Sequence, residues 1–395
     1  MSADDPLSWF ARRIEPGLVR RIDAFWRTFA ENADRIRGQI DQTESFDTAS
    51  FMIETLAPIS PDLMFEFGPG SDGRHSLAIT TEWQDALAVF ARALLVRAPT
   101  VEGFQFTDVR PPCQPEEAVP AIEARCGGHF PPMVWSVNRG DFNLVDVSYR
   151  AENSHVPDER LQWVAETAVS TVLGEQDVRE WIGIIGSQQD SDWHDMAQGV
   201  GLENLRDAFL ERVRAIQAGL PKKPHWQTAG EVGQKWFRAT LEPEPAQDYG
   251  ARYDSRTIIG SREDIVQCWL AGARFSSARF SNHLETFCYL KIDGSVDDPL
   301  PRHDSREALE IALNDVLRPN GLGAVYGGGT GLRYSYIDLA LQSFPDAVGR
   351  IQDCLQKSEV TPRCWILFWD DVLTQQWIGA RPDSPPPPVG AFGVH

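Results

Sequence analysis

The sequence has few cysteines and no long apolar run. Its six cysteines, at positions 113, 126, 268, 288, 354 and 364, show no CxxC or CxH spacing, which excludes a zinc knuckle and a small disulfide framework. We therefore expect free thiols and predict no metal site and no cofactor. The longest uncharged apolar runs, such as 364–369, are strand-sized and far below the ~20 residues that cross a bilayer.

Basic residues are in deficit. Lys and Arg number 37 against 57 Asp and Glu, so the net charge is -20, which repels nucleic acid and anionic membranes at long range. The first residues carry acids where a secretory signal has basic residues, and no apolar core follows. These features predict a cytoplasmic protein that binds neither nucleic acid nor membrane.

The chain is long enough for more than one core. With 395 residues, 42% of them hydrophobic, it is expected to form two or three domains. A break rich in Gly and Pro follows a helical stretch near Leu220, which is typical of a linker. We predict an N-terminal domain over 1–220, a C-terminal domain over 221–380 and an extended Pro-rich tail over 381–395.

One pattern of elements occurs three times. Two short strands joined by a turn, an amphipathic helix and a third strand are indicated, with hairpins at 63–80, 134–149 and 324–339. In the second copy the helix is expected at 158–173 and the last strand near 178–185. In the third, Gly327 to Gly331 are interpreted as a turn that needs positive φ.

The C-terminal copy extends upstream by one strand and one helix. Counted from Leu284, the order is strand, helix, strand, strand, helix, strand, which is the plan of ferredoxin-like domains. The predicted fold class is therefore α+β, with repeated strand-strand-helix-strand units and a C-terminal antiparallel sheet covered by helices on one face.

Three stretches carry a resemblance to known sequences: 174–178 (GEQDV), 325–339 (VYGGGTGLRYSYIDL) and 365–368 (WILF). With them the chain resembles a loosely defined group of uncharacterised bacterial proteins with ferredoxin-like βαβ units. The resemblance implies a bacterial, cytoplasmic α+β protein. It assigns no activity and no catalytic residue.

The candidate binding residues begin on one predicted strand. Tyr334, Tyr336 and Asp338 alternate along it and share a face, while Arg333 lies on the other. If the tyrosine face is open, it forms an aromatic platform for a partner or ligand. The alternative is that these tyrosines pack beneath the helices while Asp338 accepts hydrogen bonds from backbone donors.

Two further candidates end the last strand. Asp370 and Asp371 are adjacent there, where they either join Asp338 in an acidic cluster or serve as solvated or capping residues. A polar loop over 190–195 contains three Asp and one His, but its spacing matches no known metal motif.

No reaction motif is legible. The glycine run lacks the ending of a P-loop, the histidines stand singly, and no nucleophile elbow occurs. We therefore expect a non-catalytic protein-binding module, an immunity-type or regulatory protein that sequesters a basic partner. The alternative is an enzyme or small-ligand sensor with a pocket between the domains.

Overall fold

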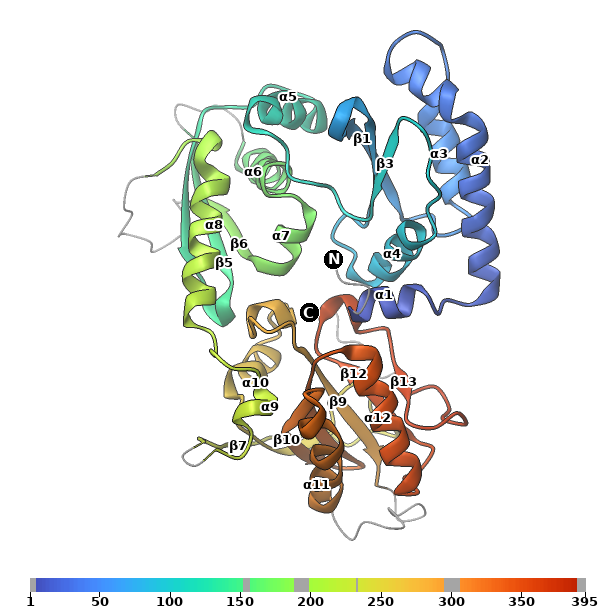
Figure 1. Ribbon diagram of the computed structural model, residues 1–395. Helices are drawn as coiled ribbons and strands as arrows, with labels where there is room; N and C mark the ends of the chain where they lie inside the picture. Colours follow the sequence, from blue (N-terminus) through green and yellow to red (C-terminus); the bar gives the residue numbers. More distant parts are fainter. Residues whose placement is uncertain (1–4, 152–156, 188–198, 232–233, 295–305, 389–395) are drawn as a thin grey trace. The chain divides into compact units, whose positions relative to one another are not determined.

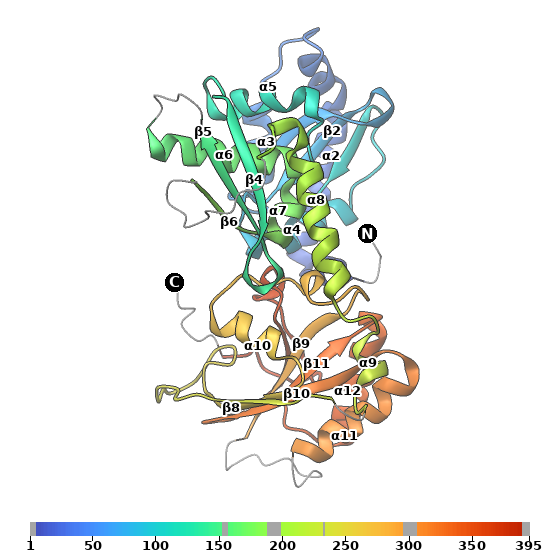
Figure 2. The same ribbon diagram turned by 90° about the vertical axis from the view of Figure 1, so that its left-hand side faces the viewer.

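A computed structural model describes residues 5–151, 157–187, 199–231, 234–294 and 306–388 (Figures 1 and 2). The chain divides into two compact units. The N-terminal unit comprises Phe10–Ala218, and the C-terminal unit comprises the chain from Gly219 onward together with the segment up to Trp9. The predicted boundary at Leu220 lies beside this division. The first residues join the C-terminal unit because Trp9 packs edge-on against Phe344, with ring centroids 5.8 Å apart.

The first half of the N-terminal unit holds one three-stranded sheet. Strand β1 (Met64–Pro69) pairs antiparallel with β2 (His75–Thr80), and β2 pairs parallel with β3 (Phe104–Thr107). Apolar residues of this sheet share a core with three helices, α2 (Pro16–Ile40), α3 (Thr48–Leu56) and α4 (Ala88–Val96). The amphipathic helices are thus held by burial of one face each.

The second half repeats this plan. Strand β4 (Met133–Arg139) pairs antiparallel with β5 (Val145–Ala151), and β5 pairs parallel with β6 (Ile182–Ser187). Its core is completed by four helices, α5 (Pro115–Cys126), α6 (Asp158–Leu173), α7 (Glu175–Trp181) and α8 (Leu202–Gly219).

One expectation for this half is wrong. The strand predicted near 178–185 begins only at Ile182, because residues 175–181 form helix α7. Two acids, Glu175 and Asp177, lie in the first turn of α7, where the helix dipole favours negative charge. The second hairpin is therefore followed by two helices and one strand.

The two N-terminal hairpins share one turn geometry. The Gly70 amide donates to the Arg74 carbonyl at 2.8 Å, and the Gly140 amide donates to the Leu144 carbonyl at 2.9 Å. Each turn is a short 3-10 segment with two consecutive residues of positive φ, Asp72 (57°) and Gly73 (73°) in the first turn and Phe142 (52°) and Asn143 (61°) in the second. The predicted repetition of strand-strand-helix-strand units is thus confirmed, although the turn letters differ.

The C-terminal unit contains a seven-stranded antiparallel sheet in the order β13-β12-β9-β11-β10-β8-β7. Its four central strands and the helices α11 and α12 follow the ferredoxin-like order, which confirms the predicted fold class. Figure 2 shows α11 beside α12. The bounds are β7 (Phe237–Thr240), β8 (Ser255–Gly260), β9 (Thr286–Asp293), α11 (Arg306–Leu317), β10 (Gly323–Gly331), β11 (Tyr334–Leu341), α12 (Phe344–Lys357), β12 (Cys364–Phe368) and β13 (Ile378–Gly379).

Smaller elements complete the two units. Helix α1 (Pro6–Ala11) opens the described chain, and α9 (His225–Thr228) and α10 (Glu263–Leu270) belong to the C-terminal unit. The start of the Pro-rich tail is packed, since the Trp365 indole donates to the Pro385 carbonyl at 2.6 Å. Within the described ranges, no helix combines the length and the apolar character that crossing a bilayer requires.

The glycine run was wrongly predicted to form a turn. Gly327, Gly328 and Gly329 lie inside β10, without positive φ, and the connection to β11 is made by residues 332–333. A Cβ at Gly328 would stand 2.4 Å from the Tyr336 carbonyl, and one at Gly329 would stand 2.7 Å from the Thr257 carbonyl. The glycines are needed because neighbouring backbone approaches the strand too closely for a side chain.

Candidate functional site

The predicted aromatic platform is buried. Tyr334, Tyr336 and Asp338 are exposed by 1%, 0% and 1%, so the expectation of an open tyrosine face is wrong. The alternative is right that these residues belong to the core, but the tyrosines do not lie beneath the helices, and Asp338 pairs with the Arg252 side chain rather than with backbone donors. The segment 246–254 covers them: the Tyr334 hydroxyl donates to Asp248 at 2.5 Å, and the Tyr336 hydroxyl donates to Asp254. The face of the sheet opposite α11 and α12 is therefore closed by the chain itself.

Arg252 is the centre of this buried cluster. Its guanidinium pairs with the Asp338 carboxylate, and both side chains are 1% exposed. Three rings surround it, with centroids 4.7 Å (Tyr336), 5.2 Å (Trp369) and 5.3 Å (Tyr289) from the guanidinium carbon. Such cation–π contacts strengthen when water is excluded. Burial raises the pKa of Asp338, and the Arg252 charge opposes that rise.

Asp254 fixes the connection between β10 and β11. Its carboxylate accepts hydrogen bonds from the backbone amides of Arg333 and Tyr334, at 2.8 and 2.9 Å. A Cβ at Gly331 would stand 2.2 Å from this carboxylate, so glycine is required there. The carboxylate replaces the water that would otherwise solvate these amides.

Arg333 lies at the rim of the cluster. Its guanidinium donates to Asp293 at 2.9 Å, and Arg363 donates to the same carboxylate at 2.5 Å. Both arginines also lie within 3.6 Å of the Asp248 carboxylate. Arg333 thus joins Tyr334 and Asp338 in one network, but every one of these groups is engaged within the C-terminal unit.

Lys291 is a fully buried cation beside this rim. It is 0% exposed, its ammonium donates to the Tyr249 carbonyl, and it lies 4.1 Å from the centroid of the Tyr334 ring. Burial lowers the pKa of Lys291 to about 8, because the charged form loses its hydration.

The titration of Lys291 predicts a pH dependence of stability. Between pH 8 and 10.5 the unfolded chain holds this proton while the folded chain releases it, so stability rises with pH in this window. From pH 7.5 to 9.5 the wild type should gain about 1–2 kcal/mol of unfolding free energy relative to Lys291→Met, measured by urea denaturation. Lys291→Arg, which stays charged, should show no such gain. Parallel pH profiles for wild type and Lys291→Met would contradict this assignment.

Asp370 and Asp371 do not join Asp338 in an acidic cluster. The Asp370 carboxylate accepts the Ser277 amide at 2.6 Å and the Ser277 hydroxyl at 2.5 Å, and Asp371 accepts the Phe275 amide at 3.0 Å. Burial raises the pKa of Asp370 to about 6. These two acids hold the loop at 275–277. Asp370 is buried and its side chain does not cap the 3-10 segment that follows it, so the solvated or capping role considered for it is wrong as well.

A second polar cluster, which sequence reasoning missed, joins the two halves of the N-terminal unit. The buried Glu175 carboxylate at the start of α7 accepts the Thr81 amide at 3.0 Å, the Thr81 hydroxyl at 2.8 Å and the Arg110 amide at 3.0 Å. Thr81 and Arg110 follow β2 and β3 of the first sheet, so one side chain connects both repeats. In the sequence analysis, Glu175 was singled out only as part of the GEQDV stretch at 174–178.

The same junction contains strained backbone. Glu82 and Trp83 have φ of 42° and 74°, a region that non-glycine residues rarely occupy. The Glu82 carboxylate pairs with the Arg110 guanidinium, which also donates to Glu66 at 2.6 Å. The Glu82 side chain thus lies against Arg110, and Trp83 is 41% exposed.

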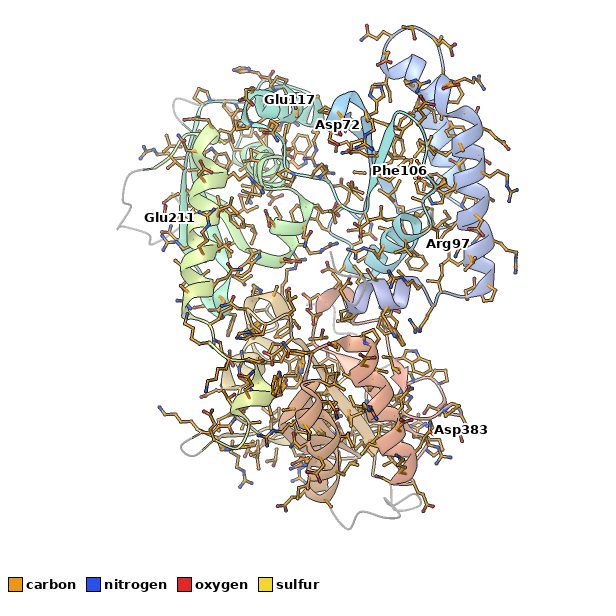
Figure 3. All side chains as sticks on the ribbon, in the orientation of Figure 1. Asp72, Arg97, Phe106, Glu117, Glu211 and Asp383 are labelled. Atoms are coloured by element: carbon orange, nitrogen blue, oxygen red, sulfur yellow. The ribbon has the colours of Figure 1, made fainter. Side chains whose placement is uncertain are left out.

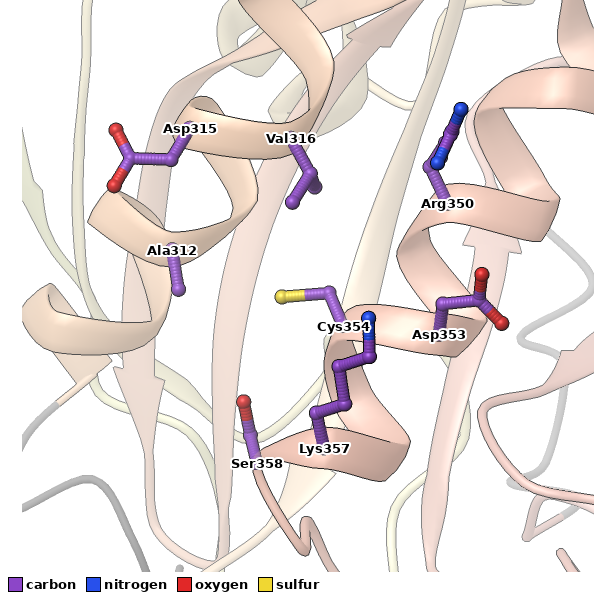
Figure 4. Close-up of a pocket in the computed structure, with 8 residues that line it drawn as sticks. All are labelled: Ala312, Asp315, Val316, Arg350, Asp353, Cys354, Lys357 and Ser358. Carbon is purple, nitrogen blue, oxygen red and sulfur yellow. The ribbon is translucent and has the colours of Figure 1, made fainter.

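A groove of about 430 Å³ lies between α11 and α12 (Figure 4). Arg350 and Lys357 line it together with Asp315 and Asp353, so it does not select a ligand of one charge. Burial raises the pKa of the Cys354 thiol in this groove, which keeps it protonated at neutral pH and unsuited to nucleophilic chemistry.

Among the residues that the structure describes, no group of three or more His, Cys, Asp or Glu side chains is placed to hold a metal ion. The acidic loop at 190–195 lies outside the described residues. The described cysteines are all free thiols.

Comparisons of the chain with family models, with curated proteins and with solved structures found no significant match.

Proposed function

We propose that this protein is a non-catalytic bacterial cytoplasmic binding protein, of the immunity or regulatory type, that sequesters a basic protein partner through its N-terminal unit. The observation that carries the proposal is an asymmetry of charge. Residues 10–218 contain 33 Asp and Glu against 19 Lys and Arg, whereas residues 219–395 contain 22 against 18. An acidic unit attracts a cationic partner at long range and raises the rate of encounter.

Side chains on the N-terminal unit support this assignment. Glu117 on α5 and Glu211 on α8 are exposed acids (Figure 3). Trp163 on α6 is 40% exposed and stacks with the Arg160 guanidinium at 4.6 Å, and Val119 on α5 is 39% exposed. Aromatic side chains are enriched among the residues that anchor protein interfaces.

The proposal is tested by affinity capture followed by titration of the purified captured protein. The immobilised full chain is exposed to a lysate of its source cell, and the bound protein is identified by mass spectrometry. We expect a protein with net positive charge whose affinity falls at least tenfold between 50 and 500 mM NaCl, because salt screens attraction between surfaces. An acidic captured protein, or a salt-independent affinity, would contradict the proposal.

Matched variants locate the interaction on one unit. Glu117→Gln, Asp207→Asn and Glu211→Gln together remove three exposed charges from the N-terminal unit, and Glu242→Gln, Glu244→Gln and Asp346→Asn remove three from the C-terminal unit. The first set should lower the association rate about threefold or more, and the second should leave it nearly unchanged. Equal effects would assign the attraction to the whole chain. A zero-length carboxyl–amine crosslinker adds an independent readout. The first lysine of this chain is Lys222, so residues 10–218 can be crosslinked to a partner only through their own carboxylates and the amines of the partner.

A further inference from the structure

Strand β6 lies at an edge of its sheet, in the order β4-β5-β6. The opposite edge, β4, is covered by Val200. The Trp135 amide on β4 donates to the Val200 carbonyl at 2.9 Å, and the Val200 amide donates to the Trp135 carbonyl at 2.8 Å. In the described ranges no strand pairs with the outer side of β6.

The composition of β6 sets it apart from most of the other edge strands. Edge strands are normally protected by charges, prolines or short length. β1 carries Glu66 and Pro69, β7 carries Arg238, and β13 has only two residues. β3 is also an uncharged edge strand, but it has only four residues and none of them is exposed. β6 reads Ile-Gly-Ile-Ile-Gly-Ser, without charge or proline, and its Ile184 is 60% exposed. An uncharged edge of this kind is a template for an added strand.

Acidic side chains lie beside this edge. Asp146 on β5 accepts the Ile184 amide at 2.9 Å. Gln162 on α6 donates to the Ile185 carbonyl at 2.7 Å and to the Glu166 carboxylate at 2.7 Å. Both carboxylates therefore lie near the middle of β6, at the adjacent residues Ile184 and Ile185, and they favour cationic side chains on a segment paired with the strand.

We propose that β6 is the docking strand of this protein, and that an extended cationic segment of a protein partner pairs with it as a fourth strand. The proposal rests on the proposed function, whose partner is basic, and names the part of the N-terminal unit that binds it. A second copy of this chain is the disfavoured occupant, because two chains of net charge -20 repel each other.

The probe is a synthetic ten-residue peptide of alternating valine and arginine, added to the full chain. Its control has the same sequence with every central backbone nitrogen methylated, which keeps the charge but removes the donors of strand pairing. We expect the methylated peptide to bind at least tenfold more weakly. Hydrogen exchange of the amides in 182–187 should slow on addition of the unmethylated peptide alone.

A variant pair tests the strand itself. Ile184→Lys places a cation on the edge and should weaken binding of the unmethylated peptide at least tenfold, while Ile184→Thr keeps a β-branched, uncharged residue and should change it less than threefold. Circular dichroism melting checks that both variants fold. Equal binding of the two peptides, no protection at 182–187, no binding at millimolar peptide, or a dimer of the chain alone in sedimentation would each overturn the β6 proposal. A salt-sensitive basic partner captured without protection at β6 would leave the proposed function standing.

Discussion

Replacement of Arg252 by methionine is expected to lower the free energy of unfolding by about 3–5 kcal/mol, because it leaves the Asp338 carboxylate buried without its partner. The three rings around the guanidinium also lose their cation. Urea denaturation of the purified full chain measures the effect. A loss below 1 kcal/mol would mean that Asp338 is protonated or solvated in the variant.

The double variant Arg252→Met with Asp338→Leu separates the ion pair from packing. It should recover most of the stability lost in Arg252→Met, since a buried ion pair replaced by apolar residues of similar volume is often neutral. Two guanidinium nitrogens of Arg252, Nε and Nη2, have no hydrogen-bond acceptor among the residues that the structure describes, so within these residues the wild-type pair is incompletely satisfied. Arg256→Met is the matched control: Arg256 is exposed on β8, and its loss should change stability by less than about 0.5 kcal/mol.

Replacement of Glu175 by alanine is expected to lower the free energy of unfolding of the N-terminal unit by about 3–4 kcal/mol. The change leaves the Thr81 amide and hydroxyl and the Arg110 amide without their acceptor at a buried junction. Urea denaturation measures the loss. Equal stability of Glu175→Ala and wild type would show that water replaces the carboxylate without cost.

Glu175→Gln provides a graded comparison. Its amide oxygen still accepts from Thr81, but its nitrogen then faces the Arg110 amide, so a smaller loss of about 1–2 kcal/mol is expected. Glu211→Ala is the surface control, because Glu211 is exposed on α8 of the same unit and should change stability by less than about 0.5 kcal/mol. The loss of unfolding free energy should therefore be largest for Glu175→Ala, smaller for Glu175→Gln and smallest for Glu211→Ala. This order is expected if the Glu175 carboxylate joins the two repeats.

Both positions show that buried polar side chains connect segments of this protein that lie far apart in the sequence. The Tyr334 and Tyr336 side chains belong to the core of the C-terminal unit, so they do not meet a partner directly. The proposed binding surface lies instead on the N-terminal unit, which has the excess of acidic residues and the uncharged edge of β6.

Periodicity alone identified the main elements. The apolar spacing of α6 predicted its type and bounds, the alternation in β11 predicted a strand, and the order of elements from Leu284 predicted the ferredoxin-like sheet. These features are local, because a helix or strand with one apolar face must bury that face wherever it lies. The fold class follows from such faces in sequence order.

The position of the site was decided by tertiary structure. The alternation along β11 places Tyr334, Tyr336 and Asp338 on one face but does not say whether that face is covered, and the cover is supplied by 246–254, about 85 residues earlier in the chain. Likewise, the role of Glu175 depends on backbone groups 94 and 65 residues away. The sequence determined the charge, the repeated units and the sheet, because these follow from composition and local pattern. Only the folded chain decided which polar residues are buried and which edge is open, because pairing between distant segments leaves no local pattern.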